Sequence, residues 1–238
     1  MRLVWAQGNV DMQQALLNTY VRSIVDILLQ HREVLEIVSE VLQSFQYPEE
    51  PGLAAKLASI RVTYSQTDVD GNTIIPPYIV SLLENLDRLY KQNRVRIRYQ
   101  RGAVVELLGR RLVCPRYSTE QECSNGGYFR DDRGQRISAQ EVDVASLSLA
   151  RRHAEGYECK LKAGDLESHD CIELAYLIDA AQGSGFSVNV GVISFDSDKR
   201  VNRQLRHLQP TFQHLPLARN IRVYGLESIW SLQVSPFK

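Results

Sequence analysis

Three residues that can bind a metal ion and activate water lie on two neighbouring segments of the chain. Asp143 lies in residues 141–145, and Glu158 and Lys160 lie in residues 156–162. Both segments alternate apolar with polar residues, and the polar stretch between them ends in glycine, which predicts an antiparallel hairpin. Glu158 and Lys160 are two residues apart and therefore point to the same face of their strand.

Two carboxylates and a lysine on one sheet face suit the hydrolysis of a phosphodiester. Carboxylate oxygens bind hard divalent cations. Such a cation lowers the pKa of a bound water and offsets phosphate charge. A lysine can orient or deprotonate that water, or stabilise the charge that develops in the transition state. The alternative is an exposed hairpin with an ordinary Glu–Lys pair, because Glu-x-Lys is a common tripeptide.

The arrangement Asp-Val-Ala, about fifteen residues, then Glu-Cys-Lys, resembles the PD-(D/E)xK nuclease superfamily, which has the restriction-endonuclease-like fold. The resemblance covers roughly residues 100–230 and includes a helix before the motif and an amphipathic helix after it. It implies that Asp143 and Glu158 bind Mg²⁺ (or Mn²⁺) and that Lys160 assists the attacking water. The main-chain oxygen of Cys159 is implied as another ligand.

A further acid of the family often lies on the helix before the motif, and Glu106 in residues 102–108 is the candidate here. A glutamate on a helix is more commonly just solvated, so only the resemblance points to Glu106. Val142 stands where the family usually has proline. The family's substrates favour DNA over RNA.

The order of predicted elements in the C-terminal part fits the same fold. A right-handed crossover through the helix after the motif places the next strand parallel to the Glu158 strand. The expected fold is therefore α/β, a restriction-endonuclease-like mixed sheet flanked by helices. Helices are expected at residues 102–111, 168–182 and 199–208, strands at 128–130, 186–195 and 220–225, and a closing turn at 226–232.

The N-terminal part is predicted to be all helical, with domains at residues 1–95 and 96–238. Apolar residues recur at spacings of three and four across residues 10–46. Shorter helices are expected at 52–61 and 76–91, with a loop between them. The wide apolar stripe of residues 10–46 packs into the core of its own domain or forms a homodimer seam. This region would serve dimerisation, substrate selection or regulation.

A basic stretch, residues 91–101, is the candidate nucleic-acid contact. Arg94, Arg96 and Arg98 alternate with apolar residues, so an extended strand would present their guanidinium groups on one side, with Arg101 beyond. Arginine suits phosphate contacts. The alternative is a solvated edge segment whose charges discourage pairing with another sheet.

Composition narrows the class of protein further. The formal net charge is zero, which argues against a histone-like binder but not against a nuclease with a local basic patch. No signal peptide and no long apolar run is visible, so a cytoplasmic protein without membrane contact is expected. The four cysteines are expected to be reduced, and the spacing of Cys114 and Cys123 argues against zinc.

The resemblance implies a Mg²⁺-dependent nuclease, with restriction, phage defence or repair as its setting, and composition adds the expectation that it is cytoplasmic. Two alternatives stay open. The first is a non-catalytic helical-dimer interaction protein with a degenerate nuclease fold. The second is a nucleic-acid binder that uses residues 94–101 without cleavage.

Overall fold

The computed structural model describes residues 1–5, 9–117, 122–131, 133–137, 141–212 and 220–236, which fall into two compact units. The first unit is Val10–Val104, and the second combines Met1–Asn9 with Val105–Lys238. The boundary between the two units lies inside helix α6 (Arg94–Val113), between Val104 and Val105. The boundary predicted at residue 95 lies at the start of the same helix. Strand β1 (Arg2–Trp5), although N-terminal, belongs to the second unit.

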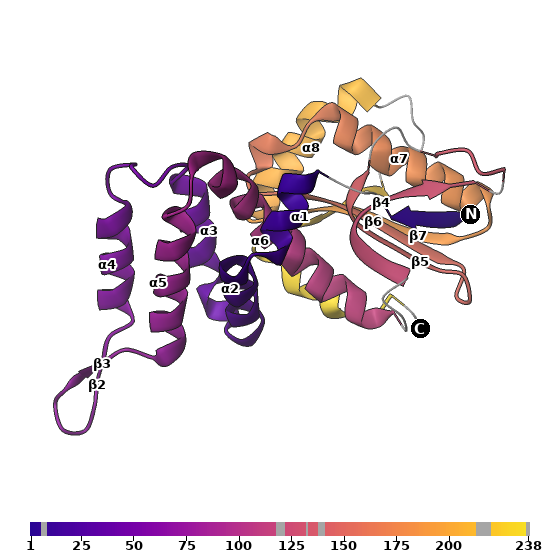
Figure 1. Cartoon of the computed structure of the whole chain (residues 1–238). Coiled ribbons are helices and arrows are strands. Elements are labelled where there is room, and N and C mark those ends of the chain that lie inside the picture. Colours follow the sequence, from indigo (N-terminus) through magenta and orange to yellow (C-terminus); the bar gives the residue numbers. More distant parts are fainter. Residues whose placement is uncertain (6–8, 118–121, 132, 138–140, 213–219, 237–238) are drawn as a thin grey trace. The chain divides into compact units, whose positions relative to one another are not determined.

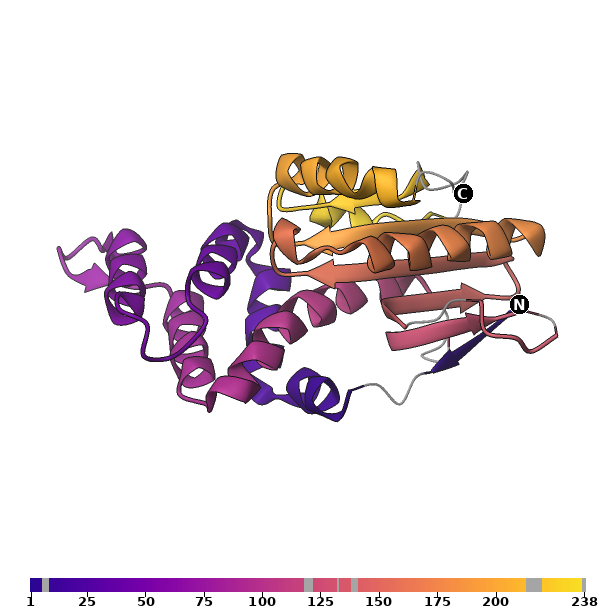
Figure 2. The same ribbon diagram turned by 90° about the horizontal axis from the view of Figure 1, so that it is seen from above.

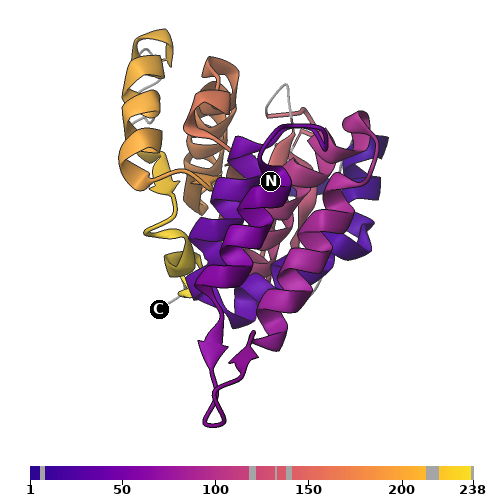
Figure 3. The ribbon, with the colours of Figure 1, turned by 90° about the vertical axis from the view of Figure 1, so that its left-hand side faces the viewer.

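The first unit is mainly helical (Figures 1 and 3). Its helices are α1 (Val10–Leu17), α2 (Thr19–Gln30), α3 (Leu35–Ser44), α4 (Leu53–Thr63), α5 (Pro77–Tyr90) and the first part of α6, with a short helical turn η1 (Arg32–Val34). It is not all helical as predicted, because β2 (Gln66–Thr67) and β3 (Thr73–Ile74) form a hairpin between α4 and α5. Asp68 builds its turn by accepting the N–H groups of Asp70 and Asn72 at 2.9 and 2.8 Å.

The apolar stripe of the first unit is buried in the unit's own core. Asn18 is the N-cap of helix α2, and its Oδ1 accepts the Tyr20 N–H at 2.8 Å. From there Ile24 and Leu28 face inward with no exposed surface, as do Leu82 and Leu86 of α5. Most of this stripe is therefore core, with Leu17 as a 65% exposed exception, and the homodimer stays a prediction.

The arginines of residues 94–101 lie in helix α6 rather than in the extended strand that their alternation suggested. Asn93 accepts the Arg96 N–H at 2.9 Å and favours the helix start, and arginine is itself a good helix former. At about 100° per residue, Arg96 does not share a face with Arg94 and Arg98. Arg101 is 8% exposed and donates its Nε–H to the Leu42 carbonyl at 2.7 Å, so its role is structural.

The second unit is a mixed α/β domain built on a six-stranded sheet (Figures 1 and 2). The strand order is β1-β4-β5-β6-β7-β8. The pairs β1–β4, β4–β5 and β5–β6 are antiparallel, whereas the pairs β6–β7 and β7–β8 are parallel. The predicted hairpin and the parallel strand after the crossover are thus confirmed. The strands are β4 (Cys123–Arg130), β5 (Val142–Ser148), β6 (His153–Lys160), β7 (Ser187–Ser194) and β8 (Arg222–Tyr224).

Helices cover both faces of this sheet. Two further helices, α7 (Ser168–Gly183) and α8 (Asp198–Phe212), lie side by side on one face (Figures 1 and 2). A Cβ on Gly156 of β6 would lie 2.5 Å from Leu177 of α7, so this glycine allows the close approach of α7. The second part of α6 packs on the opposite face at Gly109. Short helical turns complete the unit at η2 (Cys114–Arg116), η4 (Ala163–Asp165) and η6 (Ile229–Gln233).

The cysteines depart from expectation. Cys114 and Cys123 form a disulfide with a Cα–Cα distance of 5.4 Å, joining the turn after α6 to the start of β4. The expectation of four reduced thiols is therefore wrong for this pair, because folding brings together two cysteines that the sequence leaves nine residues apart. Cys159 and Cys171 are free thiols. Among the described helices, none is long and apolar enough to cross a membrane.

Candidate active site where β5 begins and β6 ends

Asp143, near the start of β5, is held by a main-chain hydrogen bond from the neighbouring strand. The Cys159 N–H donates to Asp143 Oδ2 at 2.7 Å. This contact crosses from β5 to β6 just beyond the last paired residues, Val144 and Tyr157. The hairpin predicted from the sequence therefore brings Asp143 next to the Glu-Cys-Lys segment.

Glu158 and Lys160, at the end of β6, point to the same side and contact each other. Glu158 is 4% exposed, and its Oε2 lies 3.3 Å from Lys160 Nζ. The Lys160 side chain keeps 18% of its surface, so its ammonium group stays within reach of solvent. The strand period of two produces this pairing.

Glu106 reaches the same site from α6 because the helix approaches the sheet closely. A Cβ on Gly109 would lie 2.9 Å from Ile193 and 3.4 Å from the Cys159 sulfur, so glycine favours this close approach. Glu106 lies three residues earlier on the same helical face. It is 7% exposed and interacts electrostatically with Asp143 and Lys160.

Asp170 is a member of this site that the sequence motif did not identify. It is 3% exposed, and its Oδ1 lies 2.9 Å from Lys160 Nζ. Its Oδ2 accepts the Glu167 N–H at 2.8 Å and so caps the start of α7. The side chain of the neighbouring His169 is 45% exposed and places Nε2 3.2 Å from Asp170 Oδ1. The sequence signal that could have identified Asp170 is an acidic residue in the first turn of the helix after the motif.

Burial and mutual repulsion dominate the electrostatics of the site. Burial raises the pKa of Glu158 well above its usual value, and the Asp143 charge raises it further, against the opposing effect of Lys160. Burial and then Asp143 likewise raise the pKa of Glu106. Burial also raises the pKa of Asp143, although Lys160 and the Cys159 N–H oppose this. One ammonium thus faces several crowded carboxylates.

The donor chemistry of the site fits a hard divalent cation, but the side chains are not set in a metal geometry. Among the described residues, no group of three or more His, Cys, Asp and Glu side chains is arranged to hold a metal ion. Lys160 instead bridges Glu158 and Asp170. Mg²⁺ or Mn²⁺ would bind the carboxylate oxygens and neutralise their crowded negative charge. Binding of a cation requires reorientation of carboxylates toward a common point.

A second buried polar cluster lies on the opposite face of β6. Glu155 is fully buried, three residues before Glu158, and its carboxylate accepts hydrogen bonds from Arg116 Nη1 at 3.0 Å and Tyr117 Oη at 2.8 Å. Tyr157 Oη and Ser146 Oγ donate at 3.1 and 3.3 Å. Because the carboxylate is well paired, this cluster stabilises the fold rather than forming a reactive site.

Comparison with models of known protein families and with curated proteins finds no match. The geometry of the site is therefore the basis for assigning a function.

Proposed function

We propose that this protein is a Mg²⁺-dependent nuclease of the PD-(D/E)xK type that hydrolyses phosphodiester bonds, with DNA as the favoured substrate. The observation that carries the proposal is the grouping of three acids around Lys160 where β5 begins and β6 ends. Glu158 contacts the ammonium group at 3.3 Å, and Asp143 and Glu106 interact with it electrostatically. The order α6-β4-β5-β6-α7-β7 supports a restriction-endonuclease-like core, with β1 and β8 added at the edges.

In this proposal the carboxylates of Asp143 and Glu158 hold the cation, together with Glu106 and the Cys159 carbonyl oxygen. A bound Mg²⁺ supplies an acidified water and neutralises phosphate charge. Cys159 has a second role, because its N–H fixes one Asp143 oxygen at 2.7 Å. The β5–β6 hairpin therefore presents the Asp143 and Glu158 carboxylates on a rigid element.

Lys160 orients the attacking water and stabilises the charge that develops on the phosphate. Burial lowers its pKa, but Glu158, Asp143 and Asp170 outweigh burial and raise the pKa above its usual value. At neutral pH the side chain is therefore an ammonium group, which donates hydrogen bonds. Lys160 acts on this basis as an electrostatic and positioning group rather than as the proton acceptor.

A basic stripe on α8 supports a polyanionic substrate. Lys199, Arg203 and Arg206 are exposed and recur at spacings of four and three, which places them on one helical face. The middle of α8 is tied to the segment between Lys160 and α7, since Gln204 Nε2 donates to the Leu166 carbonyl at 3.1 Å. Phosphate contacts from this stripe would position a strand without reading its sequence.

Cleavage assays test the proposal directly. Supercoiled plasmid, linear duplex, single-stranded DNA and RNA are incubated with Mg²⁺, Mn²⁺ or EDTA. Wild type is compared with Lys160→Ala and Asp143→Ala, and with Lys56→Ala as the control, because Lys56 lies on α4 of the first unit and pairs with Glu40. Cutting that needs metal, survives in Lys56→Ala and falls at least about a hundredfold in the site variants supports the nuclease. Cutting that is equal in all four proteins contradicts it.

One observation favours a non-catalytic nucleic-acid binder as the second candidate. Lys160 bonds to Glu158 and Asp170 in place of a metal-ready arrangement of acids among the described residues. A binder of this kind predicts salt-dependent DNA association that Asp143→Ala leaves unchanged and Arg203→Ala weakens. Calorimetric titration with Mg²⁺ separates the two functions, because Asp143→Ala abolishes cation binding only if the protein is the nuclease.

A further inference from the structure

Three arginines lie side by side at the β1–β4 edge of the sheet in the second unit (Figure 1). Arg2 of β1 is paired directly with Arg130 of β4, and a further antiparallel bridge pairs Arg130 with Arg136. The neighbouring Leu3 and Phe129 pack into the core that α7 covers, so the side chains of Arg2 and Arg130 point to the opposite face. We call Arg2, Arg130 and Arg136 the arginine cluster.

The guanidinium groups of the cluster gather around Tyr128 and the turn at Gly134. Arg136 lies over the Tyr128 ring at 4.2 Å from its centroid, and Arg130 lies 5.3 Å from the same centroid. Arg130 also donates to the Gly134 carbonyl at 2.6 Å and to Tyr128 Oη at 3.3 Å. A Cβ on Gly134 would lie 3.1 Å from Arg2 Nη2, so Arg2 reaches the same turn.

The positive charge of the cluster is not matched by acids in the described part of the chain. None of the ion pairs formed between described residues includes a cluster arginine. Residues 130–136 together with Arg2 contain four arginines and two aspartates, and Asp131 uses one oxygen to accept a main-chain N–H of its own turn. Like charges directly opposite each other on paired strands are destabilising. A bound anion would therefore stabilise this edge of the sheet.

The cluster lies beyond the end of the sheet at which the candidate active site is found. Gly127 of β4 pairs with Val142, the residue before Asp143. Arg130 follows Gly127 by three residues, which is about 10 Å along a strand. Successive phosphates of one DNA strand advance about 3.4 Å along the helix axis. A DNA strand that runs along β4 from Asp143 therefore reaches Arg130 after about three nucleotides.

We propose that the arginine cluster binds consecutive phosphates of a nucleic-acid strand whose scissile phosphate lies at Asp143. This role rests on the proposed nuclease function, which identifies the polyanion as a nucleic acid. A guanidinium group donates to two phosphate oxygens at once, and Tyr128 holds Arg130 and Arg136 in place before the phosphates arrive. Contacts of this kind position a strand without reading its bases.

Fluorescence anisotropy of the full chain in EDTA measures strand binding without cleavage. The probe is a short fluorescein-labelled DNA oligonucleotide, used as a single strand and as a duplex over a range of salt concentrations. Arg2 and Arg136 are both exposed, so they are substituted, whereas Arg130 is kept because it holds the Gly134 turn. Arg2→Ala and Arg136→Ala are each expected to weaken binding about tenfold. Each should also reduce the slope of log affinity against log salt by about one.

A conservative variant separates the charge of Arg136 from its shape. Arg136→Lys keeps one positive charge, so its salt slope is expected to equal that of wild type. A lysine ammonium lacks the planar fork, so the affinity of Arg136→Lys should lie between those of wild type and Arg136→Ala. A salt slope for Arg136→Lys equal to that of Arg136→Ala would contradict a phosphate contact.

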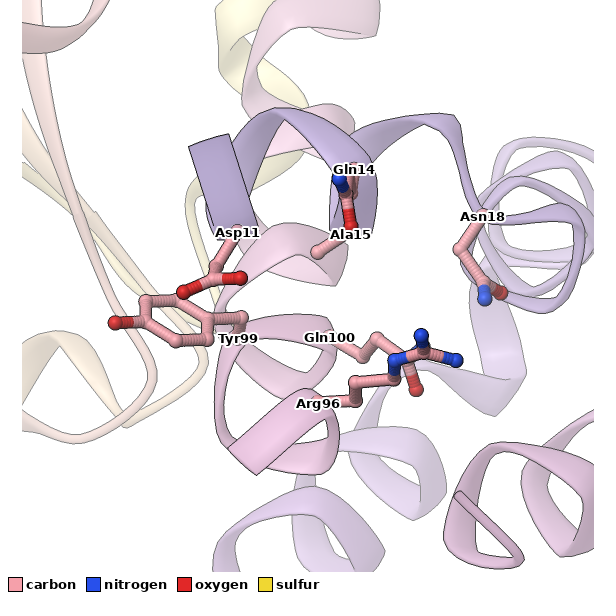
Figure 4. Close-up of a pocket in the computed structure, with 7 residues that line it drawn as sticks. All are labelled: Asp11, Gln14, Ala15, Asn18, Arg96, Tyr99 and Gln100. Atoms are coloured by element: carbon pink, nitrogen blue, oxygen red, sulfur yellow. The ribbon is translucent and has the colours of Figure 1, made fainter. Parts of the chain in front are cut away.

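Arg96→Ala is the matched control, because it removes an exposed arginine of the first unit. Arg96 lines a polar pocket of that unit together with Asp11, Tyr99 and Gln100, and Figure 4 shows its guanidinium group beside the Gln100 side chain. Its affinity and salt slope are expected to equal those of wild type. A loss of affinity equal to that of Arg136→Ala would overturn the assignment, since any lost arginine would then have the same effect.

A merely structural role of the cluster predicts different results. Arg2→Ala removes a charge directly opposite Arg130, so its melting temperature is expected to stay at or above that of wild type. A structural arginine would instead lower it. In cleavage assays with Mg²⁺, Arg2→Ala and Arg136→Ala are expected to raise KM about tenfold and to leave kcat within about twofold, because they remove uniform binding of the strand. Lys160→Ala is expected to lower kcat.

Several outcomes overturn the proposal and are distinct from failure of the nuclease function. Wild-type affinity and salt slope in both Arg2→Ala and Arg136→Ala would overturn it, as would metal-dependent cutting with unchanged KM in these variants, which leaves the nuclease standing. Poly-glutamate that binds as tightly as the oligonucleotides would assign the cluster to an acidic protein partner instead. Oligonucleotide binding that depends on the cluster, in a protein that cuts no substrate with any metal, supports the binding surface and overturns the nuclease.

Discussion

Lys160 Nζ lies 2.9 Å from Oδ1 of Asp170, an acid outside the Asp…Glu-x-Lys motif. The other oxygen of the same carboxylate caps α7 through the Glu167 N–H. Asp170 therefore couples the folding of α7 to the position of the lysine ammonium. A residue that holds Lys160 in this way is a positioning residue, and its effect on the reaction differs from that of a metal ligand.

Asp170→Asn is expected to reduce cleavage about 10–100-fold, the range for partners that orient a site from outside the ligand set. Asparagine can still accept the Glu167 N–H, so α7 keeps its cap. The loss of one negative charge lowers the pKa of Lys160, so the activity of the variant declines at a lower pH than that of wild type. A pH–rate profile measures this shift. Asp165→Asn, which alters a cap on η4, is the control and keeps the wild-type profile.

The crowded carboxylates make the metal-free protein less stable as pH rises. Glu106 and Glu158 have folded-state pKa values raised above the usual 4.5. Between pH 4.5 and those values the folded state holds more protons than the unfolded state, so the free energy of unfolding decreases with pH. Urea unfolding in EDTA at pH 5 and pH 8 measures this slope.

Glu106→Gln is expected to flatten that slope and raise the free energy of unfolding at pH 8 by about 1 kcal/mol or more, since one pKa unit corresponds to about 1.4 kcal/mol. At pH 4 the variant and wild type should be alike. Glu84→Gln, at an exposed helical position of the first unit, is the control. A lower stability of Glu106→Gln at pH 8 would mean that Glu106 is held by favourable contacts rather than by repulsion.

Divalent cations are expected to neutralise the repulsion between the site carboxylates and so to stabilise the folded protein. At a concentration of one hundred times the dissociation constant, Mg²⁺ should stabilise the folded protein by about 2.7 kcal/mol. Thermal unfolding with Mg²⁺, Mn²⁺ and Ca²⁺ measures this effect, and Asp143→Asn should abolish it. A stabilisation that survives Asp143→Asn would place the cation elsewhere in the protein.

The sequence contained most of what defines the candidate site. Strand periodicity puts Glu158 and Lys160 on one side of β6, and the short connection to β5 makes the hairpin that delivers Asp143. The helical crossover after β6 then predicts a parallel β7. Each of these inferences depends on contacts between segments near one another in the sequence, which local patterns specify well.

The remaining features depend on contacts that local patterns do not encode. Arg94, Arg96 and Arg98 have the period of a strand, but Asn93 starts a helix there and Val95 is left 62% exposed. Asp170 is a helix cap by sequence, and only the turn after Lys160 brings it to the ammonium group. The pairing of Cys114 with Cys123 likewise follows from the position of β4, a strand predicted only in part.

The buried ion pair between Arg116 and Glu155 provides a test of the fold that is separate from catalysis. Burial raises the pKa of Glu155, but hydrogen bonds from His153 and Tyr117 and the Arg116 charge outweigh burial and lower it. The stabilisation from ionised Glu155 is therefore fully present above the unfolded pKa of 4.5 and is lost as pH falls through the lower folded value. Acid unfolding of the second unit should begin in this range.

Arg116→Met leaves the Glu155 charge buried without its cation and is expected to cost about 3–5 kcal/mol of stability at pH 7. Adding Glu155→Gln to this variant removes the uncompensated charge and should recover part of the loss, so the two substitutions are not additive. Urea unfolding of the single and double variants measures the coupling. Arg98→Met, at an exposed helical position, is the control and should change stability by less than about 0.5 kcal/mol. Additive losses in the double variant would mean that Arg116 stabilises the unit through packing alone.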